Sequence, residues 1–237
     1  MGVLQLLSGF YEKAASGKPS CGDVYWVPVP FVDQVTRVLE ATRADPRNHA
    51  EFDFFIQQIE ARHFTKRNDR LPLKLLHLES TEEAVIARAK KRPAIVLCQG
   101  CVSDTGEHLS PVDQRMAKEL TRDCYVVAPM YSTATPQEPG MFMPQLVARI
   151  RAMSYAHLAC LPELGKNEPV PGEIVRLDRM MVTHLSRGCD YSGYRLHPES
   201  RGLIQGQLSW FLNGEVNEEL AVIIELARSM LPETKKA

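Results

Sequence analysis

An arginine and an aspartate two residues apart are the first candidates for chemistry in this sequence. Arg176 and Asp178 lie in the run Ile174–Asp178, which we expect to form a strand, so its period of two points both side chains to one face. A carboxylate can accept a proton, whereas an always-charged arginine suits an electrostatic clamp better than a proton donor. The alternative is an ion pair on the strand surface without a catalytic role.

A second arginine stands where an apolar strand is expected to begin. Arg92 follows Lys90 and Lys91 and precedes Pro93 and the run Ala94–Cys98. Because proline disfavours the helical conformation of the residue before it, Arg92 should lie extended at the mouth of this strand. It is either a ligand for an anion or one of three solvated basic residues.

Cys98 and Cys101 have the CxxC spacing of a redox pair or of half a zinc site. A second CxxC is absent from the sequence, and His108 and Cys124 would have to fold beside the first to complete a metal site. We therefore expect reduced, buried thiols, no metal and no cofactor, as in a cytoplasmic protein.

The composition is that of a globular protein with a core, because 44% of its 237 residues are hydrophobic and 24% are charged. The net charge of −1 argues against a protein that coats nucleic acid through bulk charge, but leaves room for a local basic site. No apolar run approaches the roughly 20 residues that cross a bilayer, so no membrane partner is expected.

The pattern along the chain is one of short strands interrupted by helices. Runs rich in β-branched and aromatic residues predict strands at 24–29, 94–98, 124–131, 155–161, 174–178 and 181–185. Apolar periodicity and capping residues predict helices at 3–15, 33–45, 48–63, 80–87, 110–122, 140–153 and 216–231.

Four of these segments, taken in order, resemble the MazF/PemK (Kid) toxin family. GDVYWV at Gly22–Val27 is similar to the first strand of that family, and KKRPAIVL at Lys90–Leu97 is similar to the second. YVVAPMYST at Tyr125–Thr133 resembles the third strand and its hydroxyl-bearing end. The segment GEIVRLDRMMVTHLSR, at Gly172–Arg187, resembles the late strand pair.

The resemblance implies an α+β fold, a small SH3-like β-barrel of the MazF/PemK/CcdB type with inserted helices and a C-terminal packing helix. One elaborated domain would span residues 1–237, with helical insertions at about 33–89, between the first two strands, and at about 110–122 and 140–153. The chain departs from the family where the first insertion replaces a short polar loop, and where Tyr131 stands in place of a Thr or Ser.

The activity that the resemblance implies is metal-independent, sequence-selective cleavage of single-stranded RNA, in which the 2′-hydroxyl attacks its own phosphate. Asp178 would be the base, Arg176 would stabilise charge, and Arg92 would bind the scissile phosphate through two hydrogen bonds. The remaining substrate contacts would come from Lys91, Tyr131, Ser132 and Thr133.

The partners that the resemblance implies are a second copy of the chain, in a homodimer, and an antitoxin protein, as for the cytoplasmic toxin of a type II toxin–antitoxin system. Two other functions stay open. A barrel that has lost the chemistry would bind RNA or protein without cleaving it, and Tyr131 and the missing loop element favour this alternative. A gyrase-inhibiting poison of the CcdB type is the third candidate.

Overall fold

The computed structural model describes residues 2–32, 35–42, 45, 47, 51, 53–64, 78, 82–99, 124–133, 142–185 and 188–230. The chain divides into two compact units, one made of Met1–Pro28 and Lys91–Ala237, the other of Val29–Lys90. The larger unit combines strands with α-helices, so the expected α+β class is confirmed. The single domain expected from the sequence stays a prediction.

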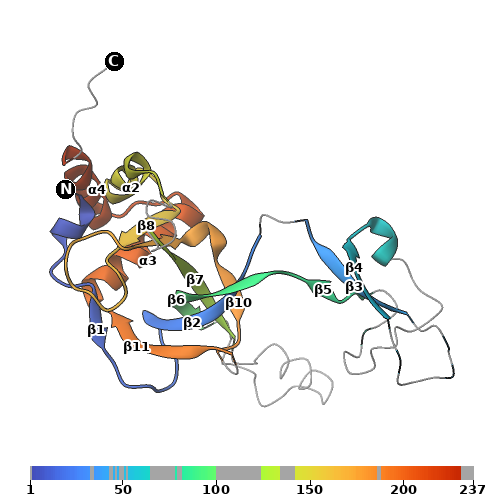
Figure 1. The fold of residues 1–237 in the computed structure, drawn as a ribbon. Coiled ribbons are helices and arrows are strands. Elements are labelled where there is room, and N and C mark those ends of the chain that lie inside the picture. Colours follow the sequence, from blue (N-terminus) through green and yellow to red (C-terminus); the bar gives the residue numbers. More distant parts are fainter. Residues whose placement is uncertain are drawn as a thin grey trace, which may run out of the picture. The chain divides into compact units, whose positions relative to one another are not determined.

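An eight-stranded antiparallel sheet curls into a half-barrel and forms the frame of the larger unit (Figure 1). Its strand order is β1-β11-β2-β6-β7-β9-β8, and β10 pairs with β7 beside this path. The strands are β1 (Tyr11–Lys13), β2 (Asp23–Pro30), β6 (Ala89–Gln99), β7 (Tyr125–Ser132), β8 (Leu158–Leu161), β9 (Glu173–Arg176), β10 (Met181–Thr183) and β11 (Asp190–Leu196). Six of them fall on the six predicted strands, whereas β1 and β11 were not expected.

Three α-helices belong to the described part of this unit: α2 (Pro144–Arg151), α3 (Pro198–Asn213) and α4 (Glu218–Ser229). They lie on one side of the curled sheet (Figure 1). Helices α2 and α4 confirm the predictions at 140–153 and 216–231 where the chain is described. Helix α3 was missed, although Pro198 in its first turn and Gly214 after its end, at φ 76°, are ordinary boundary signals.

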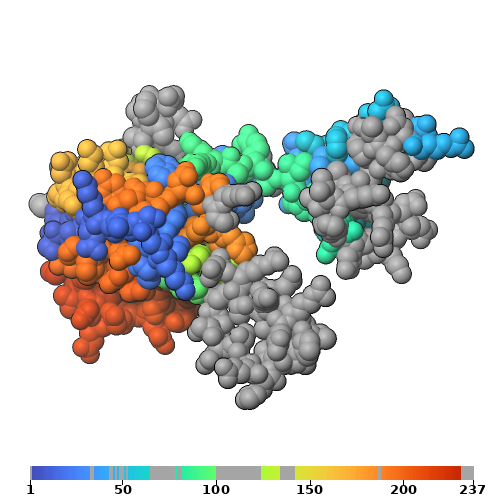
Figure 2. Space-filling view, turned by 90° about the horizontal axis from the view of Figure 1, so that it is seen from below, coloured from blue at the N-terminus to red at the C-terminus, as the bar shows by residue number. Residues whose placement is uncertain are grey.

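The predicted helix at 3–15 is wrong. Only a 3₁₀ turn, η1 (Val3–Leu6), forms there, and β1 follows it and pairs with β11. The pairing with a distant strand outweighs the weak helical preference of this stretch. The N-terminal segment with β1 thus lies beside β11, and Figure 2 shows the N-terminal segment (blue) next to the later part of the chain (orange) on one face of the unit.

One continuous hydrophobic core joins the sheet to the helices. Ile95 and Met130 contribute from β6 and β7, Ile204 from α3, and Leu4 from η1, each at most 1% exposed. Leu220 and other apolar residues of α4 close the core from the C-terminal side. The expected packing role of this last helix is therefore confirmed.

The smaller unit is built on a three-stranded sheet of order β4-β3-β5: β3 (Arg37–Thr42), β4 (Asp53–Gln58) and β5 (Val85–Ile86). A 3₁₀ turn, η2 (Ala61–Phe64), follows β4. The helices predicted at 33–45, 48–63 and 80–87 are therefore wrong within the described residues. The run of aromatic and β-branched residues in β4 suits a strand, and its helix-like spacing was misleading because short apolar runs fit both periods.

The helix predicted at 110–122 lies outside the described residues. The same holds for Asn48 and Ser80, the expected first residues of two helices.

A buried aspartate ties the start of β2 to β11. Asp23 is 3% exposed and accepts hydrogen bonds from Arg195 Nε, at 2.6 Å, and from the backbone N–H and the hydroxyl of Ser20, at 2.8 and 3.1 Å. Since Asp23 and Arg195 are also cross-strand partners, this network supports the pairing of two strands far apart in the sequence.

We expect Asp23→Ala to lower the free energy of unfolding by about 2–4 kcal/mol, because it removes the acceptor of Arg195 Nε and of the Ser20 N–H and hydroxyl. Urea denaturation measures the change. Asp190→Ala is the matched control, since Asp190 pairs with Lys91 on the surface and its loss should cost less than about 1 kcal/mol. Equal losses for the two variants would contradict the role given to Asp23.

Candidate active site

Two arginines lie against the ring of Tyr131. The guanidinium carbon of Arg92 is 4.2 Å from the ring centroid, and that of Arg176 is 5.8 Å from it. Both distances are in the range of cation–π attraction. We call Arg92, Tyr131, Arg176 and Asp178 the arginine–tyrosine cluster. Its members come from three of the four segments that carry the family resemblance.

The register of the sheet produces this meeting. In the antiparallel pair of β6 and β7, Ala94 is opposite Pro129. Two residues back along β6 and two residues on along β7, Arg92 is opposite Tyr131. On the other edge of β7, Tyr131 is opposite Ile174 of β9, and Arg176 lies two residues after Ile174 in β9. Because cross-strand neighbours and residues two apart share a face, both arginines reach the tyrosine ring from its two sides along the sheet.

Arg176 holds Asp178 through two hydrogen bonds, from Nε to Oδ1 at 2.7 Å and from its terminal nitrogen to Oδ2 at 2.5 Å. The expected strand through Asp178 is wrong in its last two residues, because β9 ends at Arg176 and the 3₁₀ turn η4 (Leu177–Arg179) follows. The two side chains nevertheless meet, since the tight turn brings the carboxylate back onto the guanidinium. Their side chains are 25% and 27% exposed.

The pKa of Asp178 is lowered from its usual 3.8. Burial alone raises the pKa of this carboxyl, but the hydrogen bonds and positive charge of Arg176 outweigh burial, and His157 contributes in the same direction. Asp178 is therefore held as a carboxylate at neutral pH, and as a weakly basic one.

His157 and Arg179 border the cluster and were not singled out in the sequence. The Arg179 Nε atom lies 4.0 Å from Asp178 Oδ2, and the carbonyl of His157 accepts the backbone N–H of Leu177 at 2.9 Å. Gln207 of α3 is buried and donates to the carbonyls of Tyr155 and Leu158 on either side of His157, at 3.1 and 2.8 Å. Helix α3, itself missed, thus positions the histidine segment.

The other predicted substrate-binding residues lie around the cluster in different ways. Lys91 precedes Arg92 on β6 and forms an ion pair with Asp190 of β11, so it is not brought to Tyr131. Thr133 donates its hydroxyl to the Gly172 carbonyl at 3.2 Å, and its backbone N–H to the same oxygen at 2.9 Å. Ser132 stands between Tyr131 and Thr133 and is opposite Glu173 in the β7–β9 ladder.

Glu173 is the third residue that the sequence reasoning missed. It is 8% exposed, and burial, reinforced by the charge of Glu163, raises the pKa of its carboxyl to about 7 although Arg92 opposes the rise. No pattern of residue types marks this glutamate, because only its burial distinguishes it from a surface carboxylate.

The cluster is suited to bind an anion. The guanidiniums of Arg92 and Arg176 lie against one aromatic ring, and each carries a planar fork of N–H donors that matches phosphate oxygens. Within the described residues, no group of three or more His, Cys, Asp or Glu side chains could hold a metal ion. Cys98 is a free, exposed thiol, which corrects its expected burial, and Cys101 lies outside the described residues.

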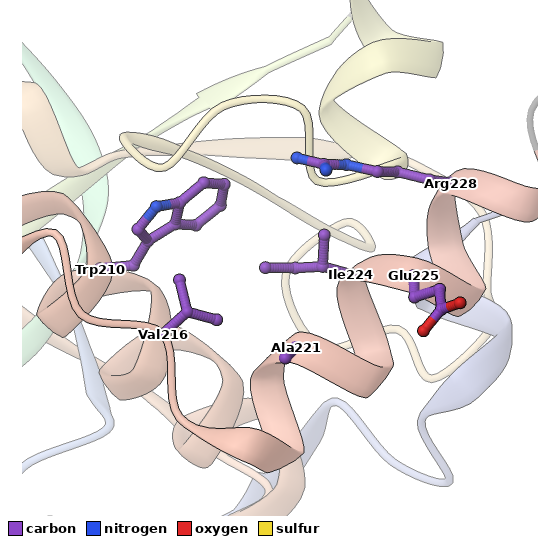
Figure 3. Close-up of a pocket in the computed structure, with 6 residues that line it drawn as sticks. All are labelled: Trp210, Val216, Ala221, Ile224, Glu225 and Arg228. Atoms are coloured by element: carbon purple, nitrogen blue, oxygen red, sulfur yellow. The ribbon is translucent and has the colours of Figure 1, made fainter.

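A separate cavity of about 400 Å³ lies between α3 and α4. Figure 3 shows Trp210 and Ile224 pointing toward one another across it, with Arg228 at its rim and Glu225 turned away. None of its lining residues belongs to the arginine–tyrosine cluster.

No helix in the described part of the chain is long and apolar enough to cross a membrane.

We expect Arg176→Gln to raise the pKa of Asp178, because the variant removes the hydrogen bonds and the charge that outweigh burial. Carboxyl chemical shifts in an NMR titration measure it. A carboxyl whose pKa is lower in the folded than in the unfolded state stabilises the fold above the unfolded pKa, and this stabilisation is lost as pH falls. Below about pH 4, wild type should therefore lose more stability than the variant. Arg179→Gln is the control and should raise the pKa less. An unchanged Asp178 pKa in Arg176→Gln would contradict this account.

Comparison with family models, with curated proteins and with solved structures finds no match to this chain.

Proposed function

We propose that this chain is an endoribonuclease that cleaves single-stranded RNA without a metal, as the toxin of a type II toxin–antitoxin system. The observation that supports the proposal best is the meeting of Arg92, Tyr131 and Arg176, with Asp178 bound to the last of them. These residues were selected from sequence patterns that lie far apart in the chain. The SH3-like type of the half-barrel, the homodimer and the antitoxin partner belong to the same proposal.

The scissile phosphate would bind to the guanidiniums of Arg92 and Arg176. A phosphate competes with Asp178 for Arg176, because both anions match the same fork of N–H donors. Binding would thereby loosen the carboxylate from its arginine and make its oxygens available to the 2′-hydroxyl. The ring of Tyr131 would keep the two guanidiniums in place or stack on a neighbouring base.

The reaction begins when the 2′-oxygen gives its proton to Asp178 and attacks the adjacent phosphorus. The bond from phosphorus to the 5′-oxygen then breaks, leaving a cyclic phosphate and a 5′-hydroxyl. The two arginines would stabilise the charge that gathers on the non-bridging oxygens, a contribution that counts more in a partly buried site than in water. Both side chains of the Arg176–Asp178 pair are about three-quarters buried.

A non-catalytic barrel that binds RNA or protein is the second candidate. It is favoured by the pair itself, because Asp178 is engaged through both carboxylate oxygens and its lowered pKa makes it a weak base. In such a protein the cluster would bind a phosphate without cleaving the RNA.

Incubation of the purified protein with mixed-sequence single-stranded RNA in excess EDTA tests the first proposal. We expect products with cyclic-phosphate and 5′-hydroxyl ends, and a loss of at least about 100-fold in rate for Asp178→Asn, which cannot accept the proton. Intact RNA that is nevertheless bound, with binding weakened by Arg176→Ala, would instead support the non-catalytic barrel.

Neighbouring basic residues on β6 give a matched pair of variants. We expect Arg92→Ala to lower kcat/KM by about 10²–10³-fold, as for the loss of a group that stabilises charge in the transition state. Lys91→Ala should lower it by less than about 3-fold, because Lys91 is engaged with Asp190 and screened surface charges contribute little. A loss of kcat/KM for Lys91→Ala as large as that for Arg92→Ala would show that Lys91 contributes to the site.

A further inference from the structure

A further cavity, of about 530 Å³, lies between the N-terminal segment, α3 and α4. Leucine and isoleucine side chains from all three elements form its apolar wall: Leu6, Leu7, Leu203, Leu220 and Ile223. Leu203 and Leu220 are buried, and the other three are half-buried. Its volume is in the range of about 300–1,000 Å³ that is typical of small-molecule sites. None of its lining residues lines the cavity of Figure 3 or belongs to the arginine–tyrosine cluster.

Three elements enclose this cavity. The 3₁₀ turn η1 packs against α4, as Figure 1 shows for the blue N-terminal segment, and α4 packs against α3. Ser8, which follows η1, is tied to α3 because its backbone N–H and its hydroxyl both donate to Glu199, each at 2.7 Å. On α3 the lining residues run from Pro198 to Gly206, which is about 12 Å along the helix axis. A hollow of this length, enclosed on three sides, suits a compact molecule better than an extended peptide.

Two glycines of α3 keep the cavity open. Gly202 and Gly206 are four residues apart on the helix, and both line the cavity. A Cβ atom at Gly202 would meet no atom within 4 Å, and the nearest atoms to one at Gly206 are those of the Leu220 side chain, at an ordinary contact distance of 3.5 Å or more. The packing of the chain therefore leaves room for alanine at both positions, and alanine would favour the helix. Glycine there preserves free volume at the expense of helix stability.

The charged side chains that line the cavity, among the described residues, are two carboxylates and no base. Glu199 belongs to the first turn of α3 and Glu219 to the first turn of α4, where a carboxylate is favourable without a basic partner. The two hydrogen bonds from Ser8 orient Glu199 and lower the pKa of its carboxyl. Within the described part of the chain, Glu219 forms no ion pair. The apolar cavity therefore carries negative charge that no lysine, arginine or histidine of its lining balances.

We propose that this cavity is a binding site for a small organic cation, an ammonium group carried on an apolar chain or ring. The apolar body would displace water from Leu203 and Leu220, and the ammonium group would lie at the carboxylates of Glu199 and Glu219. A carboxylic acid of the same shape would bring like charges together, and a neutral alcohol would gain no ion pair. The inference does not rest on the ribonuclease proposal, so its test needs no RNA.

Isothermal titration calorimetry of the full chain with octylammonium, octanol and octanoate tests the proposal. The three probes share one alkyl chain and differ in the charge at its end. We expect octylammonium to bind about 3–10-fold more tightly than octanol, the difference that one or two exposed ion pairs supply, and octanoate to bind most weakly. The preference for octylammonium should shrink as salt is added, because salt screens exposed charges.

Two variants test whether the cation binds in this cavity. Gly202→Leu should lower the affinity for octylammonium at least about 10-fold, because the new side chain takes up free volume. Glu219→Gln should lower it about 2–5-fold and leave the affinity for octanol unchanged. Glu225→Gln is the matched control, since it removes the same charge from the same helix but lines the other cavity. Thermal unfolding confirms that each variant is folded.

Several results would overturn the proposal. Equal affinities for the three probes, or tighter binding of octanoate, would contradict the choice of a cation. No detectable binding of octylammonium, or unchanged binding in Gly202→Leu, would contradict the site itself. Equal losses in Glu219→Gln and Glu225→Gln would show an effect of net charge and not of this cavity. Should Gly202→Leu fail to fold, the contrast between the two glutamate variants decides.

Discussion

The pairing of β7 along both of its edges is the constraint on which the rest of the larger unit depends. One edge takes β6, and the other is divided between β9, which pairs with Met130–Ser132, and β10, which pairs with Tyr125–Val127. The chain therefore has to leave this edge after Arg176 and return at Met181, and the 3₁₀ turn η4 makes that step beside β7. The aspartate that Arg176 binds lies in this turn, so the topology of the sheet creates the pair.

The pKa values of two carboxyls on one short stretch of chain are shifted in opposite directions by their surroundings. The pKa of Asp178, which lies against guanidinium groups at a largely buried turn, is lowered, while the pKa of Glu173, which is buried at the start of β9, is raised. Four residues lie between them in the sequence: Glu173 begins β9, and Asp178 belongs to the turn η4 that follows this strand. The difference follows from the surroundings alone, since burial disfavours the charged form of one carboxyl and the charge and hydrogen bonds of Arg176 favour that of the other.

Patterns of residue types predicted the parts of the structure that local physics controls. The apolar strands of the sheet and the stripe of α4 were found, because their periodicity is strong. The segment 33–89 was predicted to be helical, but its described part forms three strands and one 3₁₀ turn. Glu, Ala and Leu favour helices locally, whereas the pairing of β3 with both β4 and β5 favours strands. Arg92, Tyr131, Arg176 and Asp178 could be proposed as a group from resemblance. Glu173 could not, because its unusual state arises only from contacts that the fold makes.

The union of the two ends of the larger unit has a consequence for how it folds. Strand β1 and the start of β2 pair with β11, near the C-terminal side of the sheet, and the Asp23–Arg195 pair joins the same two regions. Contacts between residues so far apart in sequence close last and slow the search for the native state. During synthesis, β2 can pair with β6 as soon as β6 is available, whereas β1 has to wait for β11. The pairing of β11 with β1 and β2 therefore comes after the strands that carry the arginine–tyrosine cluster have all been made.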